Sequence, residues 1–364
     1  MNLRKVIYII ICVFCLWACH HLVDSHSSSA GTFTNPILPD GYYPRAILYE
    51  GKYYYTHATD NEIMLWETDD LTDLQHATCK EVWRPTDSKS AFNIWAPELH
   101  RVQDKWYIYF AADDGNMDNH QINVIENVAA SPMEGVFVQR GPIVTCKDCN
   151  WGIHASTFSQ DGQQYLVWSG WPQRRIVEET QCIYIAKMKN PWTLDGERVM
   201  LSKPDHVWER QWISPDGNRS AYPIYVNESP QPFRSKDGKK ILIYYAASGN
   251  WTPYYCTGML MADASADLLN PSSWTKSDEP VFSQSPQDSI WGPGGCSFVY
   301  SPDSTELYML YHAWYTDNFI LGQNKRNPRL QKVDWDDNGI PILGKPVKMG
   351  VPMKKPSNKE KSSD

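Results

Sequence analysis

The sequence predicts an all-β fold, a five-bladed β-propeller, and three observations lead to this prediction. A two-strand pattern occurs five times, its copies recur at intervals of roughly 55 to 75 residues, and almost nothing reads as a long amphipathic helix. Sheets repeated radially form a propeller, whereas a β-sandwich predicts no such regular recurrence. The five copies cover residues 45–57, 98–110, 155–168, 232–245 and 296–311.

The chain before the first copy predicts export. Arg4 and Lys5 precede the apolar run 6–18, which is too short to remain as a membrane span. The run ends in Leu-Trp-Ala followed by Cys19, which resembles a lipoprotein signal whose cysteine becomes lipidated. We therefore expect a signal peptide at 1–18, a flexible tether at 19–32 and a lipid-anchored protein. The absence of Asp after Cys19 is compatible with the outer membrane, cell surface or periplasm of a Gram-negative bacterium.

Composition limits the partners of the remaining chain. A formal charge of −8 argues against binding to nucleic acid, because phosphate binding needs clustered cations. Sixteen Trp and twenty-one Tyr residues suit strands, and their flat faces also suit an oligo- or polysaccharide. We expect the propeller at 33–350, a disordered polar tail at 351–364, and a monomer. Cys146 and Cys149 form a lone CxxC pair, and no second pair supports a zinc site.

The propeller prediction also locates the chemistry. The innermost strand of each blade begins at the central channel, so the residue before each first strand faces the axis. These positions are Tyr43, the segment 95–98, His154, Glu228 and Gly295. Any functional site is expected among them.

Several motifs resemble glycoside hydrolase family 43, which holds arabinofuranosidases, β-xylosidases and arabinanases. Residues 94–100 (Ile-Trp-Ala-Pro-Glu-Leu-His) and 105–115 resemble blade two of that family. Further motifs in the same order extend the resemblance over about residues 35–345; they lie at 168–171, 186–192, 272–276, 291–294, 311–313 and 329–332. The resemblance implies hydrolysis with inversion by three carboxylates: a general base, a general acid and an aspartate that tunes the acid.

Only one of the three carboxylates is present. The resemblance makes Glu228, in Asn-Glu-Ser-Pro, the proton donor, and burial among aromatic residues predicts a raised pKa. Tyr43 stands where the family has its base, and a phenol is a poor base at neutral pH. His154 stands where the family has its second aspartate.

The resemblance and the aromatic content also suggest binding residues. Trp95, Trp151 and Trp171 are expected to contact a glycan, and Arg329 is expected to reach the sugar or Glu228 and to lower the pKa of Glu228. The family usually has a histidine near an axial water or metal where this chain has Gly295. This difference argues against the family's axial calcium, and we expect no cofactor.

Three functional interpretations follow. In the first, the protein is a hydrolase in which His154, or more remotely Asp40, replaces the base. In the second, a group of the substrate or a polar side chain positions the water, at a loss of about 10²- to 10⁴-fold in rate. In the third, the propeller binds a glycan with little or no turnover. The retained Glu228 and Arg329 favour an enzyme. The resemblance implies plant-type glycans with arabinofuranosyl, xylosyl or related linkages as its substrates.

Overall fold

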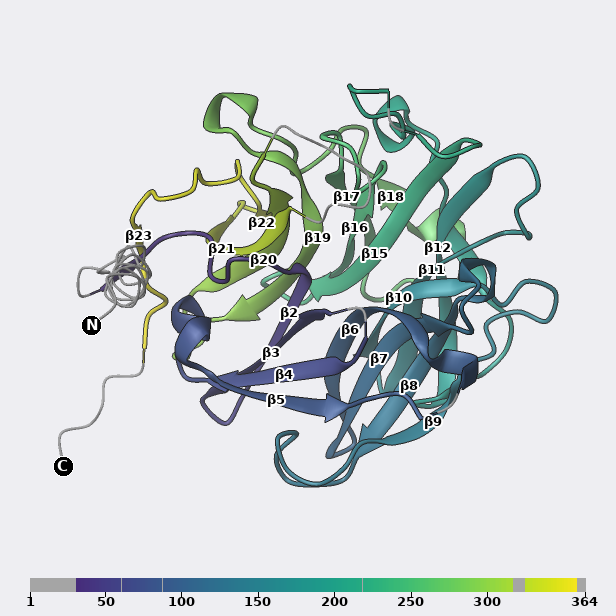
Figure 1. Cartoon of the computed structure of the whole chain (residues 1–364), viewed down its shortest axis with the longest axis horizontal. Coiled ribbons are helices and arrows are strands. Elements are labelled where there is room, and N and C mark those ends of the chain that lie inside the picture. Colours follow the sequence, from purple (N-terminus) through teal and green to yellow (C-terminus); the bar gives the residue numbers. More distant parts are fainter. Residues whose placement is uncertain (1–30, 60, 87, 218, 317–324, 359–364) are drawn as a thin grey trace, which may run out of the picture.

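The computed structural model describes residues 31–59, 61–86, 88–217, 219–316 and 325–358. Its strands form five blades around a common centre, three as separate four-stranded sheets and two merged into one nine-stranded sheet, so the predicted five-bladed β-propeller is confirmed (Figure 1). Blade 1 contains β2 (Tyr42–Tyr49), β3 (Lys52–Ala58), β4 (Ile63–Thr68) and β5 (Thr78–Trp83). Blade 2 contains β6 (Phe92–Val102), β7 (Lys105–Asp113), β8 (Gln121–Asn127) and β9 (Val138–Pro142).

Blades 3 and 4 are joined through their backbones. Blade 3 contains β10 (Gly152–Gln160), β11 (Gln163–Gly170), β12 (Glu179–Asn190), β13 (Thr193–Leu194) and β14 (Val199–Ser202). Blade 4 contains β15 (Ile224–Arg234), β16 (Lys240–Ala247), β17 (Cys256–Asp263) and β18 (Thr275–Lys276). The start of β12 pairs in parallel with the start of β15, which merges the two blades into one sheet.

Blade 5 contains β19 (Trp291–Tyr300), β20 (Leu307–Trp314), β21 (Arg326–Trp335) and β22 (Pro341–Ile342). Helical segments in the described ranges are short 3-10 turns between strands. They are η1 (Leu71–His76), η2 (Ser88–Ser90), η3 (Met117–Asn119), η4 (Val207–Glu209), η5 (Pro271–Ser273) and η6 (Pro286–Asp288).

The core lies between the blades, because each sheet packs an apolar face against the next. One buried cluster fills each gap around the ring, and each draws its residues from two neighbouring blades. Successive side chains of a strand point to opposite faces of the sheet, so each blade offers apolar residues to both of its neighbours. Trp106 and Trp168, from the aromatic-rich second strands, are completely buried in two of these clusters.

A β-bulge occurs in the inner strand of every blade, next to the axis. The strand registers shift within 42–45, 95–98, 153–156, 228–231 and 294–297. Each bulge contains one residue with a left-handed backbone; these are Tyr43, Ala96, His154, Ser229 and Gly295, with φ between 45° and 60°. A bulge bends its strand and redirects a side chain, so this repeated kink sets what each blade presents to the channel.

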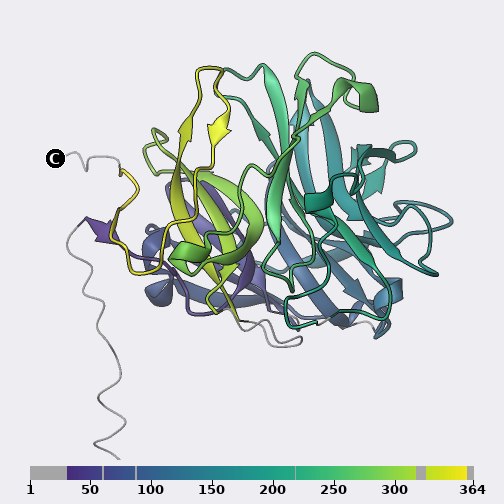
Figure 2. The same cartoon turned by 90° about the horizontal axis from the view of Figure 1, so that it is seen from above.

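The two ends of the described chain meet at the edge of the propeller. β1 (Thr32–Phe33) pairs with β23 (Met353–Lys354), as Figures 1 and 2 show. The disordered tail predicted from residue 351 is therefore wrong over 353–357, because this segment pairs with β1 and Ser357 bonds to Asp303 and Glu306. The predicted tether also extends too far, since Thr32 belongs to β1.

The predicted signal peptide and Cys19 lie outside the described residues. Within the described ranges, no helix has both the length and the apolar character needed to cross a bilayer.

Candidate active site

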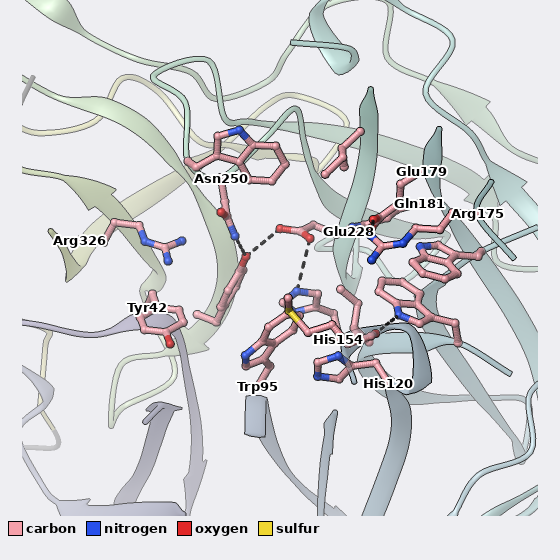
Figure 3. Close-up of a pocket in the computed structure, with 17 residues that line it drawn as sticks. Tyr42, Trp95, His120, His154, Arg175, Glu179, Gln181, Glu228, Asn250 and Arg326 are labelled. Carbon is pink, nitrogen blue, oxygen red and sulfur yellow. Dashed lines mark hydrogen bonds and ion pairs between the residues drawn. The ribbon is translucent and has the colours of Figure 1, made fainter. Parts of the chain in front are cut away.

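A pocket of about 420 Å³ opens at the axis, where the inner strands of the blades begin. Glu228 lies at its centre, with Tyr42, Asn250 and Arg326 on one side and Arg175, Glu179 and Gln181 on the other (Figure 3). The remaining lining residues are Tyr43, Trp95, Met117, His120, Trp151, Ile153, His154, Trp171, Ile224 and Trp251. The structure therefore brings six of the seven predicted site residues into one cavity.

Glu228 is buried, and its two oxygens have different surroundings. Oε1 accepts hydrogen bonds from the phenols of Tyr43 and Tyr255, both at 2.7 Å. Oε2 lies 3.6 Å from Nε2 of His154. Burial raises the pKa of Glu228, but the charge of His154 and the hydrogen bonds of its neighbours outweigh burial, so the pKa lies below its ordinary 4.5. The predicted rise in this pKa is therefore wrong.

Tyr43 contacts Glu228 directly and does not stand across the pocket from it. The bulge turns its phenol toward Glu228, its backbone N–H donates to Nδ1 of His312 at 3.0 Å, and Asn250 donates to its hydroxyl at 2.7 Å. Burial and the negative charge of Glu228 raise the pKa of Tyr43 well above 10. A phenol held in this way donates a hydrogen bond and cannot serve as a general base near neutral pH.

His154 also belongs to the surroundings of the acid. Its ring centre lies 4.4 Å from that of Tyr43, and its Nε2 is 3.6 Å from Glu228. In an inverting hydrolase, acid and base stand about 6.5–9.5 Å apart to admit a water molecule. His154 is too close to Glu228 to be that base. Its charge instead lowers the pKa of Glu228. The other predicted base, Asp40, is exposed and does not line the pocket.

The three predicted tryptophans form one wall of the pocket. Trp151 and Trp171 stack in parallel with their ring centres 4.3 Å apart, and Trp95 stacks on His120 at 4.1 Å. The guanidinium of Arg175 lies 5.1 Å from the ring centre of Trp171 and bonds to Glu179. Flat apolar faces beside charged hydrogen-bonding groups provide both kinds of contact that a sugar ring can make.

Arg329 is the predicted site residue that the structure places elsewhere. It is completely buried within blade 5, where it donates to Asn327 and to the backbone oxygen of Trp314. Arg326, three residues earlier at the start of β21, lines the pocket and lies 4.5 Å from the ring centre of Tyr42. The prediction for Arg329 is wrong because the strand turns that side chain into the blade. Its predicted effect on the pKa of Glu228 is exerted by His154.

Comparison with known proteins identifies the family. Residues 33–341 match the sequence pattern of the glycosyl hydrolases family 43. The chain belongs to this family. It is 36% identical to an extracellular exo-α-(1→5)-L-arabinofuranosidase of Streptomyces avermitilis over 89% of this chain and 66% of the relative. It is 33% identical to α-L-arabinofuranosidase 43 of Humicola insolens over the same shares of the two chains. The chain thus spans slightly less than two thirds of the length of these curated relatives.

Solved structures give the same result. The crystal structure of an α-L-arabinofuranosidase from Lactobacillus brevis superimposes with a TM-score of 0.79 at 31% identity, covering 88% of this chain and 98% of the other. Tyr43 and His154, for which the motif resemblance implies the family's two aspartate positions, both contact Glu228.

An axial calcium, which the family resemblance suggests, does not fit this chain. A Cβ added to Gly295 would lie 2.8 Å from Tyr43 and from His312, so no ligand side chain has room there. The carbonyl oxygen of Gly295 accepts a hydrogen bond from Arg45 at 2.7 Å, so a guanidinium already lies at this point of the axis. In the part of the chain that the structure describes, no three His, Cys, Asp or Glu side chains are grouped to hold a metal.

Several residues in and around the pocket were not predicted from the sequence, and four of them show why. Asn250 and Tyr255 come from the β16–β17 connection, and only folding brings them to Glu228. Arg175 belongs to the segment before β12 and gives no motif signal. Arg45 was detectable, because it places a charge near the start of an otherwise apolar inner strand.

Proposed function

We propose that the protein is a glycoside hydrolase that releases arabinofuranosyl or related pentose units from plant glycans. Two kinds of observation support this function. The family relatives named above are arabinofuranosidases, one of them exo-acting. The pocket combines an aromatic wall with a buried glutamate at the position of the family acid.

The fixed carboxylate of Glu228 is the observation that carries the proposal. Two phenols hold Oε1, which leaves Oε2 as the oxygen that carries the proton to the leaving group. A general acid needs such fixed geometry, because proton transfer requires hydrogen-bond contact with the departing oxygen. The low pKa of Glu228 makes the protonated form scarce at neutral pH, so the reaction is expected to favour acidic conditions.

The water molecule is activated without a side-chain carboxylate on the opposite face. Tyr43 and His154 both contact Glu228, and the other carboxylate of the pocket, Glu179, is bound to Arg175 and Gln181. Of the three interpretations above, the geometry favours a polar side chain or a substrate hydroxyl as the group that orients the water. Loss of a general base costs about 10²- to 10⁴-fold in rate, so we expect slow turnover.

The test is product release compared with binding. The mature protein is incubated with α-1,5-linked arabinotriose, arabinan and arabinoxylan at several pH values, and released arabinose is measured. Glu228→Gln, which keeps the size of the side chain, is the matched control. Release that is lost in Glu228→Gln supports the proposal. If calorimetry shows that arabinotriose binds but no substrate releases arabinose, the hydrolase proposal fails. The glycan-binding interpretation then takes its place.

We also propose that the protein is exported and anchored by lipid at Cys19, and that it is a monomer. The lipoprotein-like signal supports export, and two relatives are named as extracellular. Labelling cells with an alkyne-tagged fatty acid should mark the wild type, and Cys19→Ala should abolish the label. Equal labelling of both proteins contradicts the anchor, and light scattering of the mature protein measures its mass.

A further inference from the structure

A buried ion pair lies on the propeller axis, two residues further along the inner strand of blade 1 than Tyr43. Nε of Arg45 donates to Oε2 of Glu98 in blade 2 at 2.9 Å. The two side chains are only 5% and 10% exposed. A buried charge pair is a costly arrangement unless further hydrogen bonds satisfy both groups.

Those further bonds join all five blades. Arg45 donates from Nη2 to Ser229 in blade 4 at 2.7 Å, and from Nη1 to the carbonyl oxygens of Gly295 and Cys296 in blade 5 at 2.7 and 3.1 Å. Glu98 in turn accepts from Ser156 in blade 3 at 2.6 Å. It also accepts from Gln231 in blade 4 at 3.0 Å and lies 2.9 Å from His100.

Two hydrogen bonds of Arg45 reach residues that directly adjoin the site, one at the side-chain hydroxyl of Ser229 and one at the backbone of Pro44. Ser229 directly follows Glu228 and holds a left-handed φ of 53°, a conformation that is strained for a residue other than glycine. Such backbone persists only where the surroundings fix it. Nη1 of Arg45 also donates to the carbonyl oxygen of Pro44, the neighbour of Tyr43, at 3.1 Å. A single guanidinium thus holds the chain next to both partners of the Tyr43–Glu228 hydrogen bond.

We propose that Arg45 is a positioning residue, a built-in cation on the axis that fixes the backbone beneath Glu228 and Tyr43. The planar guanidinium presents five donors in fixed directions, which a spherical ion or an ammonium group does not. This inference rests on the proposed function for its catalytic readout. Its structural part, closure of the five inner strands around Arg45, does not depend on that function.

The experiment compares Arg45→Met with Arg329→Met. Arg329 is an equally buried arginine in blade 5 that does not touch the pocket, so its variant reports the effect of losing a structural arginine. A third protein, Arg45→Met/Glu98→Gln, removes both charges and avoids the unpaired buried carboxylate that otherwise endangers folding. Thermal unfolding is measured for all three, along with kcat and KM on α-1,5-linked arabinotriose, whose leaving group needs protonation.

We expect both single variants to unfold at lower temperature and the double variant to recover part of the loss. In both Arg45 variants kcat should fall by about 100-fold with little change in KM, because a shift of about 1 Å at the reacting groups has this effect. Arg329→Met should keep kcat. A fourth protein, Arg45→Ala, removes the side chain and leaves space for a small cation. Millimolar guanidinium should restore part of its kcat, and a chelator should leave the unfolding temperature and kcat of the wild type unchanged.

Two results would overturn the inference: wild-type kcat in the folded double variant, or a chelator that lowers the unfolding temperature of the wild type. If the wild type hydrolyses no glycoside, the proposed function fails, and the Kd of arabinotriose becomes the readout. A weaker Kd in the double variant than in Arg329→Met then supports positioning by Arg45. Equal Kd values in these two variants then refute it.

Discussion

Replacing Tyr43 with aspartate should speed the proposed hydrolysis. The substitution places a carboxylate where the family resemblance implies the base and removes the phenol that now bonds to Glu228. A carboxylate ends about 3 Å closer to the backbone than a phenol oxygen does, as standard bond lengths require. The new oxygens would therefore lie about 6 Å from Oε1 of Glu228, near the separation of about 6.5–9.5 Å that an inverting reaction needs.

The size of the gain follows from general-base catalysis. A positioned base contributes about 10²- to 10⁴-fold, or about 2.7–5.5 kcal/mol of activation free energy. A second negative charge near Glu228 raises the pKa of that residue, which increases its protonated fraction and favours its role as an acid. Against this stands a loss of about 3–5 kcal/mol in stability when a buried aromatic ring is removed. The left-handed φ of 55° offsets a small part of this loss, since aspartate tolerates it better than tyrosine.

The assay is kcat/KM on arabinotriose at 25 °C across a pH series, with thermal unfolding to show that the variant is folded. Tyr43→Asn is the matched control, because asparagine has the size and backbone preference of aspartate but no basic oxygen. We expect a gain in Tyr43→Asp and none in Tyr43→Asn. A folded Tyr43→Asp that turns over no faster than the wild type would show that a missing base does not limit this enzyme.

Three other predictions concern the acid and the chain terminus. Glu228→Gln should lower kcat on arabinotriose at least 100-fold. The loss should be smaller on 4-nitrophenyl arabinofuranoside, because its leaving group needs little protonation. Equal losses on the two substrates would contradict the acid role. Activity should fall as pH rises through the depressed pKa of Glu228. His154→Ala should move this fall to higher pH, because it removes a positive charge that lowers the pKa of Glu228. An unchanged pH profile would contradict this effect of His154. Deleting residues 351–364 removes the β1–β23 pair and the Lys355–Asp70 ion pair, so the unfolding temperature should drop while kcat at 25 °C persists.

The fold could be predicted from the sequence because the same two-strand pattern occurs five times in the chain. Each blade carries an aromatic-rich hairpin, and turns such as Asp161-Gly162 join the strands with the left-handed backbone that a two-residue hairpin requires. The place of Glu228 in the pocket was accessible for a similar reason, since the residues that single it out are neighbours in the chain. Its role as the acid stays a prediction.

The electrostatics of the site were not accessible, because they depend on contacts between distant residues. The partners of Glu228 on Oε1, Tyr43 and Tyr255, come from blade 1 and from the β16–β17 connection. Burial alone predicts a raised pKa, and only the convergence of these donors and His154 reverses the sign. Arg329 failed for a related reason: period-two alternation indicates that its face of β21 differs from that of Arg326, but the motif alone does not show which face meets the pocket.

The five bulges suggest how one scaffold can change its chemistry. Tyr43, Ala96, His154 and Gly295 share nearly the same φ, although they are a phenol, a methyl group, an imidazole and a hydrogen atom. The kink is thus a property of the strand and does not depend on the side chain it carries. Each blade offers an exchangeable position at the axis, where one codon change alters the reactive group and leaves the hydrogen-bonded frame intact. A propeller of this kind can lose a catalytic aspartate, and regain one, without first evolving a new backbone.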